Sequence, residues 1–199
     1  MPSSYRLLGI SGSLRANSFS SAILNSLAEA TASQSSYDYA DIGVLPHFNQ
    51  DLYVYPLPVP VQHFRDQVAA ADALVIVSSE YNHGIPGVLK NALDWASRPH
   101  NGSPLRNKPF LVVTSSPATT GGVRAQCQIR EALISALARP VNTPEIVVGL
   151  VGTKIIEGRF HDPAVIEFAL NGFAALFDEI DRLAAYGNAD VPAAQSTRA

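Results

Sequence analysis

Short apolar segments alternate along the chain with longer segments in which apolar residues recur at helical spacing. Five apolar segments indicate strands, and they span residues 5–11, 37–42, 73–78, 110–114 and 145–151. Helical patterns follow them, over residues 18–32, 61–71, a segment after Pro86, a segment from Gly122 to about 138, and a segment from about 163 onward. Short, almost wholly apolar strands between amphipathic helices are typical of a parallel sheet covered on both faces.

The number and order of these units predict an α/β fold of the flavodoxin-like type. That fold is a three-layer sandwich whose five-stranded parallel sheet has the order 2-1-3-4-5. No internal repeat or linker divides the sequence, so we expect one domain over residues 1–187 and a disordered, polar tail over residues 188–199. The proline-rich segment 44–60 predicts a long surface loop that exposes Tyr53 and Tyr55.

Three loops lie at the edge of the predicted sheet where ligands are expected. Sheets of this type bind ligands at the carboxyl ends of their strands, beside the point where the strand order reverses. The loops after the first, third and fourth strands reach that edge, and they read SGSLRANSFS, SEYNHGIPG and SSPATTGG. We therefore expect the functional residues in these three loops.

The first loop, residues 11–20, carries four serines and Arg15 just before a predicted helix. Hydroxyl groups, one guanidinium and the free N–H groups of a helix N-terminus suit the binding of a phosphate group. The dinucleotide motif G-x-G-x-x-G and the G-K-[ST] of the P-loop are both absent from the sequence. Taken alone, the loop also fits a simpler role in which the serines cap the helix and the arginine is solvated.

The second and third loops offer groups suited to a flat heterocycle. Tyr81 and His83 present aromatic faces and edges, and the backbone of a tight turn can hydrogen bond to a ring edge. The alternative is a turn in which Glu80 and Asn82 satisfy only local backbone groups. In residues 115–122, two glycines would allow the backbone to approach a ligand closely.

Charge and composition limit the partners of the chain. Only 16% of its 199 residues are charged, against roughly 25% in an ordinary soluble domain, and the formal net charge is -3. A weakly acidic chain has no long-range attraction for nucleic acid or for an anionic membrane, so neither partner is expected. The low charge predicts that a ligand or a second subunit covers part of the surface.

Nothing in the sequence indicates export, membrane insertion or metal binding. The N-terminus has no basic leader, and no apolar run approaches the roughly 20 residues that span a bilayer. The single cysteine, Cys127, cannot form an internal disulfide, so a reducing, cytoplasmic location is expected. We expect Cys127 to be buried in its helix as a small apolar side chain. The five histidines are scattered without an H-E-x-x-H pair, which predicts no metal site.

Read together, the three loops resemble a known family. The strings GSLRANSFSSAIL, SSEYNHGIPGVLKNALDWASR and TSSPATTGGVRAQCQIREAL are similar in order and spacing to motifs of the NADPH-dependent FMN reductase family, which includes chromate, quinone and azo-dye reductases. The similarity covers most of residues 5–150, and residues 80–95 carry its strongest part. The resemblance implies a flavodoxin-like fold that binds FMN non-covalently.

The resemblance also implies which residues contact the cofactor. The first loop would hold the phosphate and ribityl groups, and the second loop, with Ser116 beside it, would line the isoalloxazine ring. The implied residues are Ser13, Leu14, Arg15, Ser18, Phe19, Ser20, Glu80, Tyr81, Asn82, His83 and Ser116. The chain departs from the family pattern at Ser20, where asparagine is frequent, at Ser79, where proline is frequent, and at Ala118, where glycine is common.

The implied activity is that of a flavoenzyme that needs no catalytic side chain. In such an enzyme NADPH or NADH passes hydride to flavin N5, and a small electron acceptor then takes the electrons in a ping-pong cycle. Implied acceptors are quinones, azo compounds, free flavin and metal oxyanions such as chromate, and the implied assembly is a homodimer or homotetramer. Two other functions stay open, a non-enzymatic FMN electron carrier and a flavin-dependent sensor module.

Overall fold

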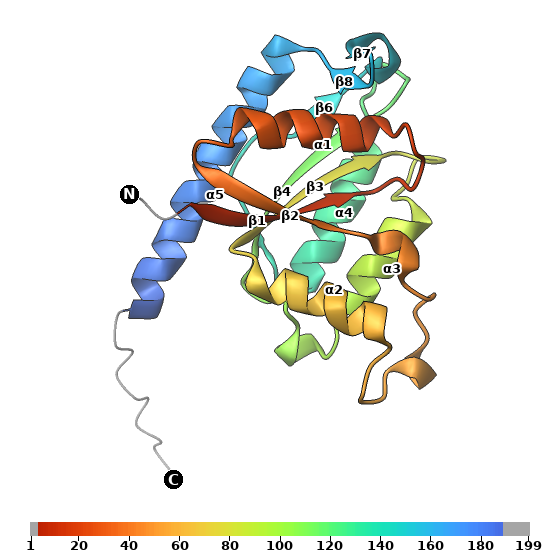
Figure 1. Ribbon diagram of the computed structural model, residues 1–199, viewed down its shortest axis with the longest axis vertical. Coiled ribbons are helices and arrows are strands. Elements are labelled where there is room, and N and C mark those ends of the chain that lie inside the picture. Colours follow the sequence, from red (N-terminus) through yellow and green to blue (C-terminus); the bar gives the residue numbers. More distant parts are fainter. Residues whose placement is uncertain (1–3, 189–199) are drawn as a thin grey trace.

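A parallel sheet lies at the centre of the structure, a computed structural model that describes residues 4–188 (Figure 1). Its four longest strands are β1 (Tyr5–Ser11), β2 (Ser35–Ala40), β3 (Ala73–Ser79) and β4 (Pro109–Ser115). The strand order is β2-β1-β3-β4-β5, which confirms the predicted flavodoxin-like topology. Ser11 pairs with Val77 and Ser79 pairs with Ser115, so β1, β3 and β4 end at the same edge of the sheet.

The fifth strand differs from the prediction, which placed it at residues 145–151. Two short strands pair with β4: β6 (Ile146–Val148), which lies within the predicted range, and β5 (Arg139–Pro140), which was not predicted. Between them, the N–H of Thr143 donates to the carbonyl of Val141. Pro144 follows and has no N–H to give to a neighbouring strand. The local turn and the proline therefore divide the strand into two pieces.

Helices cover both faces of this sheet, as predicted (Figure 1). One face carries α1 (Phe19–Ala30) and α5 (Pro163–Asn188). The opposite face carries α2 (Val59–Ala70), α3 (Gly87–Ala96) and α4 (Val123–Ser135). Each layer buries its own apolar cluster, with Phe173 fully covered on the first face and Trp95 on the second. The sheet thus separates two cores, each of which holds helices against one surface of the strands.

The segment 44–60 is anchored to α3 and is not a free surface loop. The carbonyl of Pro46 accepts hydrogen bonds from Trp95 Nε1 at 2.7 Å and from Asn91 Nδ2 at 3.0 Å. Within and beside the segment lie two 3-10 helices, η1 (Ile42–Val44) and η2 (Gln50–Leu52). Leu45 and Leu57 are buried, so the segment contributes side chains to the core.

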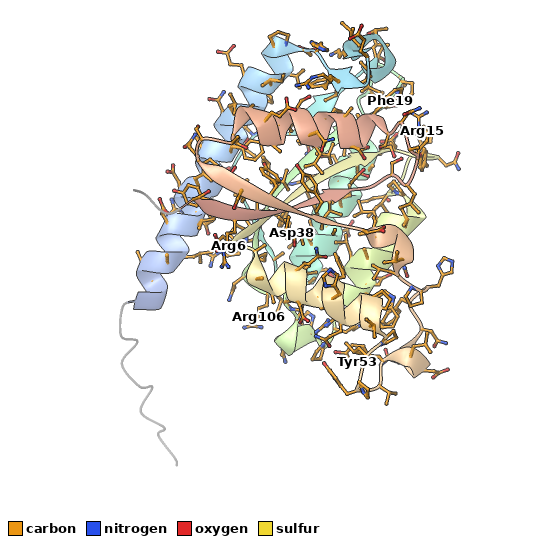
Figure 2. All side chains as sticks on the ribbon, viewed as in Figure 1. Arg6, Arg15, Phe19, Asp38, Tyr53 and Arg106 are labelled. Atoms are coloured by element: carbon orange, nitrogen blue, oxygen red, sulfur yellow. The ribbon has the colours of Figure 1, made fainter. Side chains whose placement is uncertain are left out.

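Tyr55 is exposed as predicted, but Tyr53 is half-buried and packs against the core. The two hydroxyl groups are 3.4 Å apart. Burial, and secondarily this hydrogen bond, raise the pKa of Tyr53 above its usual value. In the view of Figure 2, Tyr53 lies below Arg15 of the first loop.

Cys127 is exposed, which contradicts the expectation that it is buried. Helix α4 turns Ala125, Gln126, Ile129 and Leu133 toward the sheet. At about 3.6 residues per turn, a helix that buries these positions directs position 127 outward. The expected burial of Cys127 is therefore wrong, because position 127 lies on the side of α4 that points away from the sheet.

The remaining segments are short 3-10 helices and one hairpin. They comprise η3 (His100–Gly102), η4 (Val151–Lys154), β7 (Ile155–Ile156) and β8 (Arg159–Phe160). The hairpin turns at Glu157 and Gly158, both with positive φ, and it lies outside every predicted strand. The predicted tail lies outside the described residues, apart from Asn188, which ends α5. No helix within residues 4–188 is long and apolar enough to cross a bilayer.

Candidate functional site

A cleft of about 110 Å³ lies where the loops after β1, β3 and β4 meet. Residues implied by the family resemblance that line it are Ser13, Arg15, Ser18, Phe19, Ser20, Glu80 and Tyr81. It is lined in addition by Ser79, Ser115, Pro117 and Val151. A groove of about 760 Å³ along α1 shares Arg15, Ser18 and Phe19 with the cleft. The three predicted loops therefore converge on one site.

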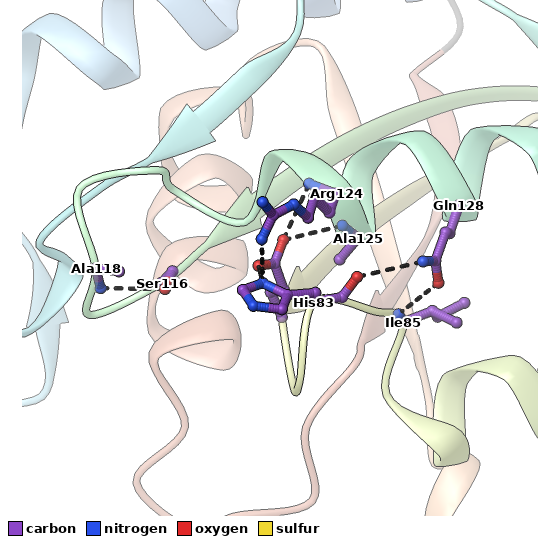
Figure 3. Close-up of polar contacts among 8 residues, drawn as sticks. His83, Ile85, Ser116, Ala118, Arg124, Ala125 and Gln128 are labelled. Atoms are coloured by element: carbon purple, nitrogen blue, oxygen red, sulfur yellow. Dashed lines mark hydrogen bonds and ion pairs between the residues drawn. The ribbon is translucent and has the colours of Figure 1, made fainter.

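Four implied residues do not line the cleft: Leu14, Asn82, His83 and Ser116. Leu14 is 59% exposed. Ser116 acts within its own loop, because its Oγ accepts a hydrogen bond from the N–H of Ala118 at 3.1 Å (Figure 3). Asn82 and His83 form the turn beside Tyr81.

Four residues that line the cleft were not predicted as site residues. For two of them, the predicted ends of the strands contained the necessary signal. Ser79 and Ser115 are the last residues of β3 and β4, so the ends of the predicted strands could have identified both. Pro117 and Val151 could not be identified together in this way, because they are distant in sequence and come close only in the folded chain. The N–H of Val151 donates to the carbonyl of Ser116 at 3.1 Å, and this contact places the start of η4 at the cleft.

The first loop ends at the N-terminus of α1, where a side chain caps one N–H group and other N–H groups stay without an acceptor. Ser18 is the N-cap of α1, and its Oγ accepts a hydrogen bond from the N–H of Ser21 at 3.2 Å. Among residues 4–188, no group accepts a hydrogen bond from the N–H of Phe19 or of Ser20. The Arg15 guanidinium lies 4.6 Å from the centre of the Phe19 ring and donates to the Asn17 carbonyl at 2.6 Å (Figure 2). Ser18 therefore has the capping role that was one interpretation of the serines. The N–H groups of Phe19 and Ser20 are still available as donors to an anion.

Two buried hydroxyl groups of the cleft have no hydrogen-bond partner in the described part of the chain. They are Ser20 Oγ and Ser79 Oγ. A buried polar group without a partner costs about 1 to 3 kcal/mol, so polar ligand atoms at the cleft would recover this energy. Together with Arg15 and the open N-terminus of α1, these hydroxyls fit a cofactor with a phosphate and a polyhydroxylated chain, as FMN has.

The second loop makes a tight turn whose two central residues have positive φ. The N–H and carbonyl of Tyr81 exchange hydrogen bonds with Gly84, at 3.1 and 2.9 Å. Between them, Asn82 has φ 48° and His83 has φ 64°. Glycine adopts this left-handed backbone without steric cost, whereas asparagine and histidine adopt it more often than other residues but still at a cost. Such strain is typical of functional loops that the surrounding structure holds in place.

Glu80 connects this loop to α4. Its Oε2 accepts hydrogen bonds from the N–H groups of Arg124 and Ala125, both at 3.0 Å. The N-cap of α4 is Gly122, which offers no side chain of its own, so Glu80 caps the helix from another element. His83 Nδ1 lies 3.6 Å from Glu80 Oε1 and also contacts the Arg124 guanidinium.

The glycines of the third loop serve close packing within the protein. Gly121 has φ 64°, and a Cβ at this position would lie 2.9 Å from the Cβ of Val147 on β6. Gly122 has φ 83° at the start of α4. The close backbone approach expected here is therefore made to the neighbouring strand, and it sets the entry of α4 into the sandwich.

Comparisons with known proteins agree with the geometry of the site. The family model "NADPH-dependent FMN reductase" matches residues 5–152. The chain is 40% identical over 177 residues to an NAD(P)H-dependent FMN reductase of Pseudomonas aeruginosa, covering 88% of this chain and 95% of the relative. It is 41% identical over 137 residues to a 2-hydroxy-1,4-benzoquinone reductase of a Burkholderia species, covering 69% and 74%.

A solved structure matches as well. The flavoenzyme FerB, an NAD(P)H:(acceptor) oxidoreductase of Paracoccus denitrificans, has a TM-score of 0.81 and 27% identity to this chain, covering 89% of this chain and 98% of its own. The family match begins at β1 and ends in η4, so it contains all three loops of the cleft. Loops, topology and relatives lead to one assignment: the chain belongs to the NADPH-dependent FMN reductase family of oxidoreductases.

Proposed function

We propose that the chain holds FMN in the cleft between its three loops and reduces small acceptors with electrons from NADPH or NADH. Bound FMN supplies the hydride acceptor, so no side chain has to act as a nucleophile. The observation that carries the proposal is the convergence of two unpartnered buried hydroxyls, Ser20 and Ser79, with Arg15 and the open N-terminus of α1.

The residues divide into two groups by the part of the cofactor that each would hold. Ser18, Ser20 and Arg15 are assigned to the phosphate and ribityl groups, because they combine hydroxyls, a positive charge and the N-terminus of α1. The turn after β3 is assigned to the ring, with Tyr81 at the rim of the cleft. Tyr81 is 56% exposed, so the chain leaves this side of the site open to a flat substrate.

The relatives favour quinones and free flavin as acceptors. One relative is named as an FMN reductase and another as a benzoquinone reductase. Azo compounds and metal oxyanions such as chromate complete the proposed range, and donor and acceptor are proposed to use the same open side in turn, in a ping-pong cycle. The competing functions are an electron carrier and a sensor module, both of which would also bind FMN.

Anaerobic reduction tests the proposed function. The purified protein is expected to be yellow, or to turn yellow with added FMN, and to bleach when NADPH or NADH is mixed with it in a stopped-flow instrument. A quinone should then restore the colour. Protein that stays colourless with FMN would contradict the proposal, and flavin that bleaches only with a partner reductase would favour the carrier. Negligible turnover with every acceptor would favour the sensor.

A homodimer or homotetramer is part of the same proposal. Val54, Tyr55 and Val59 expose 64%, 65% and 81% of their surfaces within one short segment before and at the start of α2. Neighbouring exposed apolar side chains are typical of surfaces that pair with another chain. Light scattering of the active protein at micromolar concentration should give a mass of two or four chains. A strictly monomeric mass with full turnover would contradict the assembly.

A further inference from the structure

One side chain of α4 bridges the two ends of the turn that follows β3 (Figure 3). Gln128 Oε1 accepts a hydrogen bond from the N–H of Ile85 at 3.1 Å, and Gln128 Nε2 donates to the carbonyl of His83 at 3.3 Å. A Cβ at Gly84 would lie 3.1 Å from Gln128 Oε1, so glycine at this position allows the amide its close approach. Gln128 thus clasps the backbone on both sides of Gly84.

The turn needs such external support. Asn82 and His83 both have positive φ, which costs energy for any residue other than glycine. The hydrogen bonds between Tyr81 and Gly84 close the turn, but they do not attach it to the rest of the protein. The hydrogen bonds of Gln128 attach one end of the turn to α4, and the carboxylate of Glu80 attaches the other end to α4.

The same turn presents two backbone donors that the chain itself does not use. Neither the N–H of Asn82 nor that of His83 has an acceptor within residues 4–188. Both residues follow Tyr81, which lines the cleft. Adjacent N–H groups on a backbone held in one conformation can hydrogen bond to the edge of a flat ring with little loss of entropy on binding.

We propose that Gln128 is a positioning residue for the cofactor. By clasping His83 and Ile85, it holds the turn so that the N–H groups of Asn82 and His83 are available to the edge of the flavin ring. Gln128 does not line the cleft, so it acts through the turn and not by contact with the ligand. The inference rests on the proposed binding of FMN.

Flavin titration of the apoprotein tests this role with Gln128→Met, which preserves side-chain length and removes both hydrogen bonds. FMN and riboflavin are titrated separately by flavin fluorescence. Both affinities should fall by the same factor, about fivefold, which is the scale of one neutral hydrogen bond. The midpoint potential of the bound flavin should become more negative, because donors at the ring edge favour the electron-rich reduced ring.

Two further variants distinguish the loss of the Gln128 hydrogen bonds from the effect of a new methionine on α4 and from the loss of a phosphate contact. Glu131→Met introduces the same residue one turn later on the exposed side of α4, where Glu131 makes no hydrogen bond to any described residue, and it should leave both affinities unchanged. Arg15→Ala should weaken FMN about tenfold and riboflavin hardly at all, because only FMN carries a phosphate for a charge-assisted bond. Equal losses for the two flavins therefore identify an effect at the ring.

Wild-type affinities and an unchanged potential in Gln128→Met would overturn the inference, as would a loss confined to FMN. Thermal unfolding followed by circular dichroism shows whether each variant is folded. If Gln128→Met does not fold, Gln128→Glu retains the acceptor for Ile85 and loses the donor to His83. Unchanged affinities for both flavins in that variant would also overturn the inference. Wild-type protein that binds neither flavin would instead overturn the proposed function, and the inference with it.

Discussion

Replacement of Trp95 by alanine is expected to lower the free energy of unfolding by about 4 kcal/mol, as is typical of a large buried aromatic side chain. Trp95 is fully buried, and its ring meets that of Phe48 edge-on with the ring centres 5.0 Å apart. Its Nε1 also donates to the Pro46 carbonyl at 2.7 Å. The change removes core volume and loosens the segment 44–60 together. Urea unfolding followed by circular dichroism measures the loss.

Trp95→Phe provides the matched control, because it keeps an aromatic ring in the core and removes the N–H donor. The Pro46 carbonyl then retains its hydrogen bond from Asn91 at 3.0 Å. The expected cost is about 1 to 2 kcal/mol, from one lost hydrogen bond and a smaller ring. If alanine cost no more than phenylalanine, Trp95 would not be the main anchor between α3 and the segment 44–60.

Replacement of Glu80 by alanine is expected to cost about 3 kcal/mol of unfolding free energy, since two N–H groups of a helix N-terminus lose a charged acceptor. The Glu80 side chain is only 9% exposed, so water replaces the carboxylate poorly. Gly122 offers no side chain that could take over the cap of α4. The same urea titration measures the effect, and hydrogen exchange at Arg124 and Ala125 should accelerate.

Glu80→Gln shows how much of the stability comes from the capping hydrogen bonds and how much from the negative charge of the carboxylate. The amide oxygen of glutamine can still accept from the N–H groups of Arg124 and Ala125, so the expected loss is about 1 kcal/mol. A loss in Glu80→Ala no larger than in Glu80→Gln would show that the cap contributes little. Unchanged exchange at Arg124 and Ala125 in Glu80→Ala would show that the two hydrogen bonds do not hold the N-terminus of α4 in solution.

The periodicity of the sequence was sufficient for most of the fold. The predicted strands at residues 5–11 and 73–78 match β1 and β3 closely, because continuous apolar runs in a parallel sheet are buried on both faces. The strand predicted at residues 145–151 contains β6, but β5 was not predicted, because Pro144 and the turn before it divide the pairing with β4 into two pieces. Cys127 was placed on the wrong face, since the spacing of apolar residues in α4 is compatible with more than one orientation.

Motifs predicted the loops of the site, but not the role of each side chain in them. Ser18, Ser20 and Ser79 are chemically identical, yet Ser18 caps a helix while Ser20 and Ser79 have buried, unpartnered hydroxyls within residues 4–188. Glu80 was expected at the ring and lines the cleft, while its Oε2 caps α4. Gln128 was not singled out at all, because no local pattern marks a side chain that acts on another element.

The order of strands and helices, the three loops at one sheet edge and the family could be predicted from the sequence, because they follow from local periodicity and from short motifs. Which side-chain and backbone groups contact one another became evident only from the folded structure. Glu80 reaches the N-terminus of α4 across 44 residues, and Gln128 reaches Ile85 across 43. A hydrogen bond depends on distances of a few ångström in space, and residues this far apart in sequence come that close only after the helices have packed on the sheet.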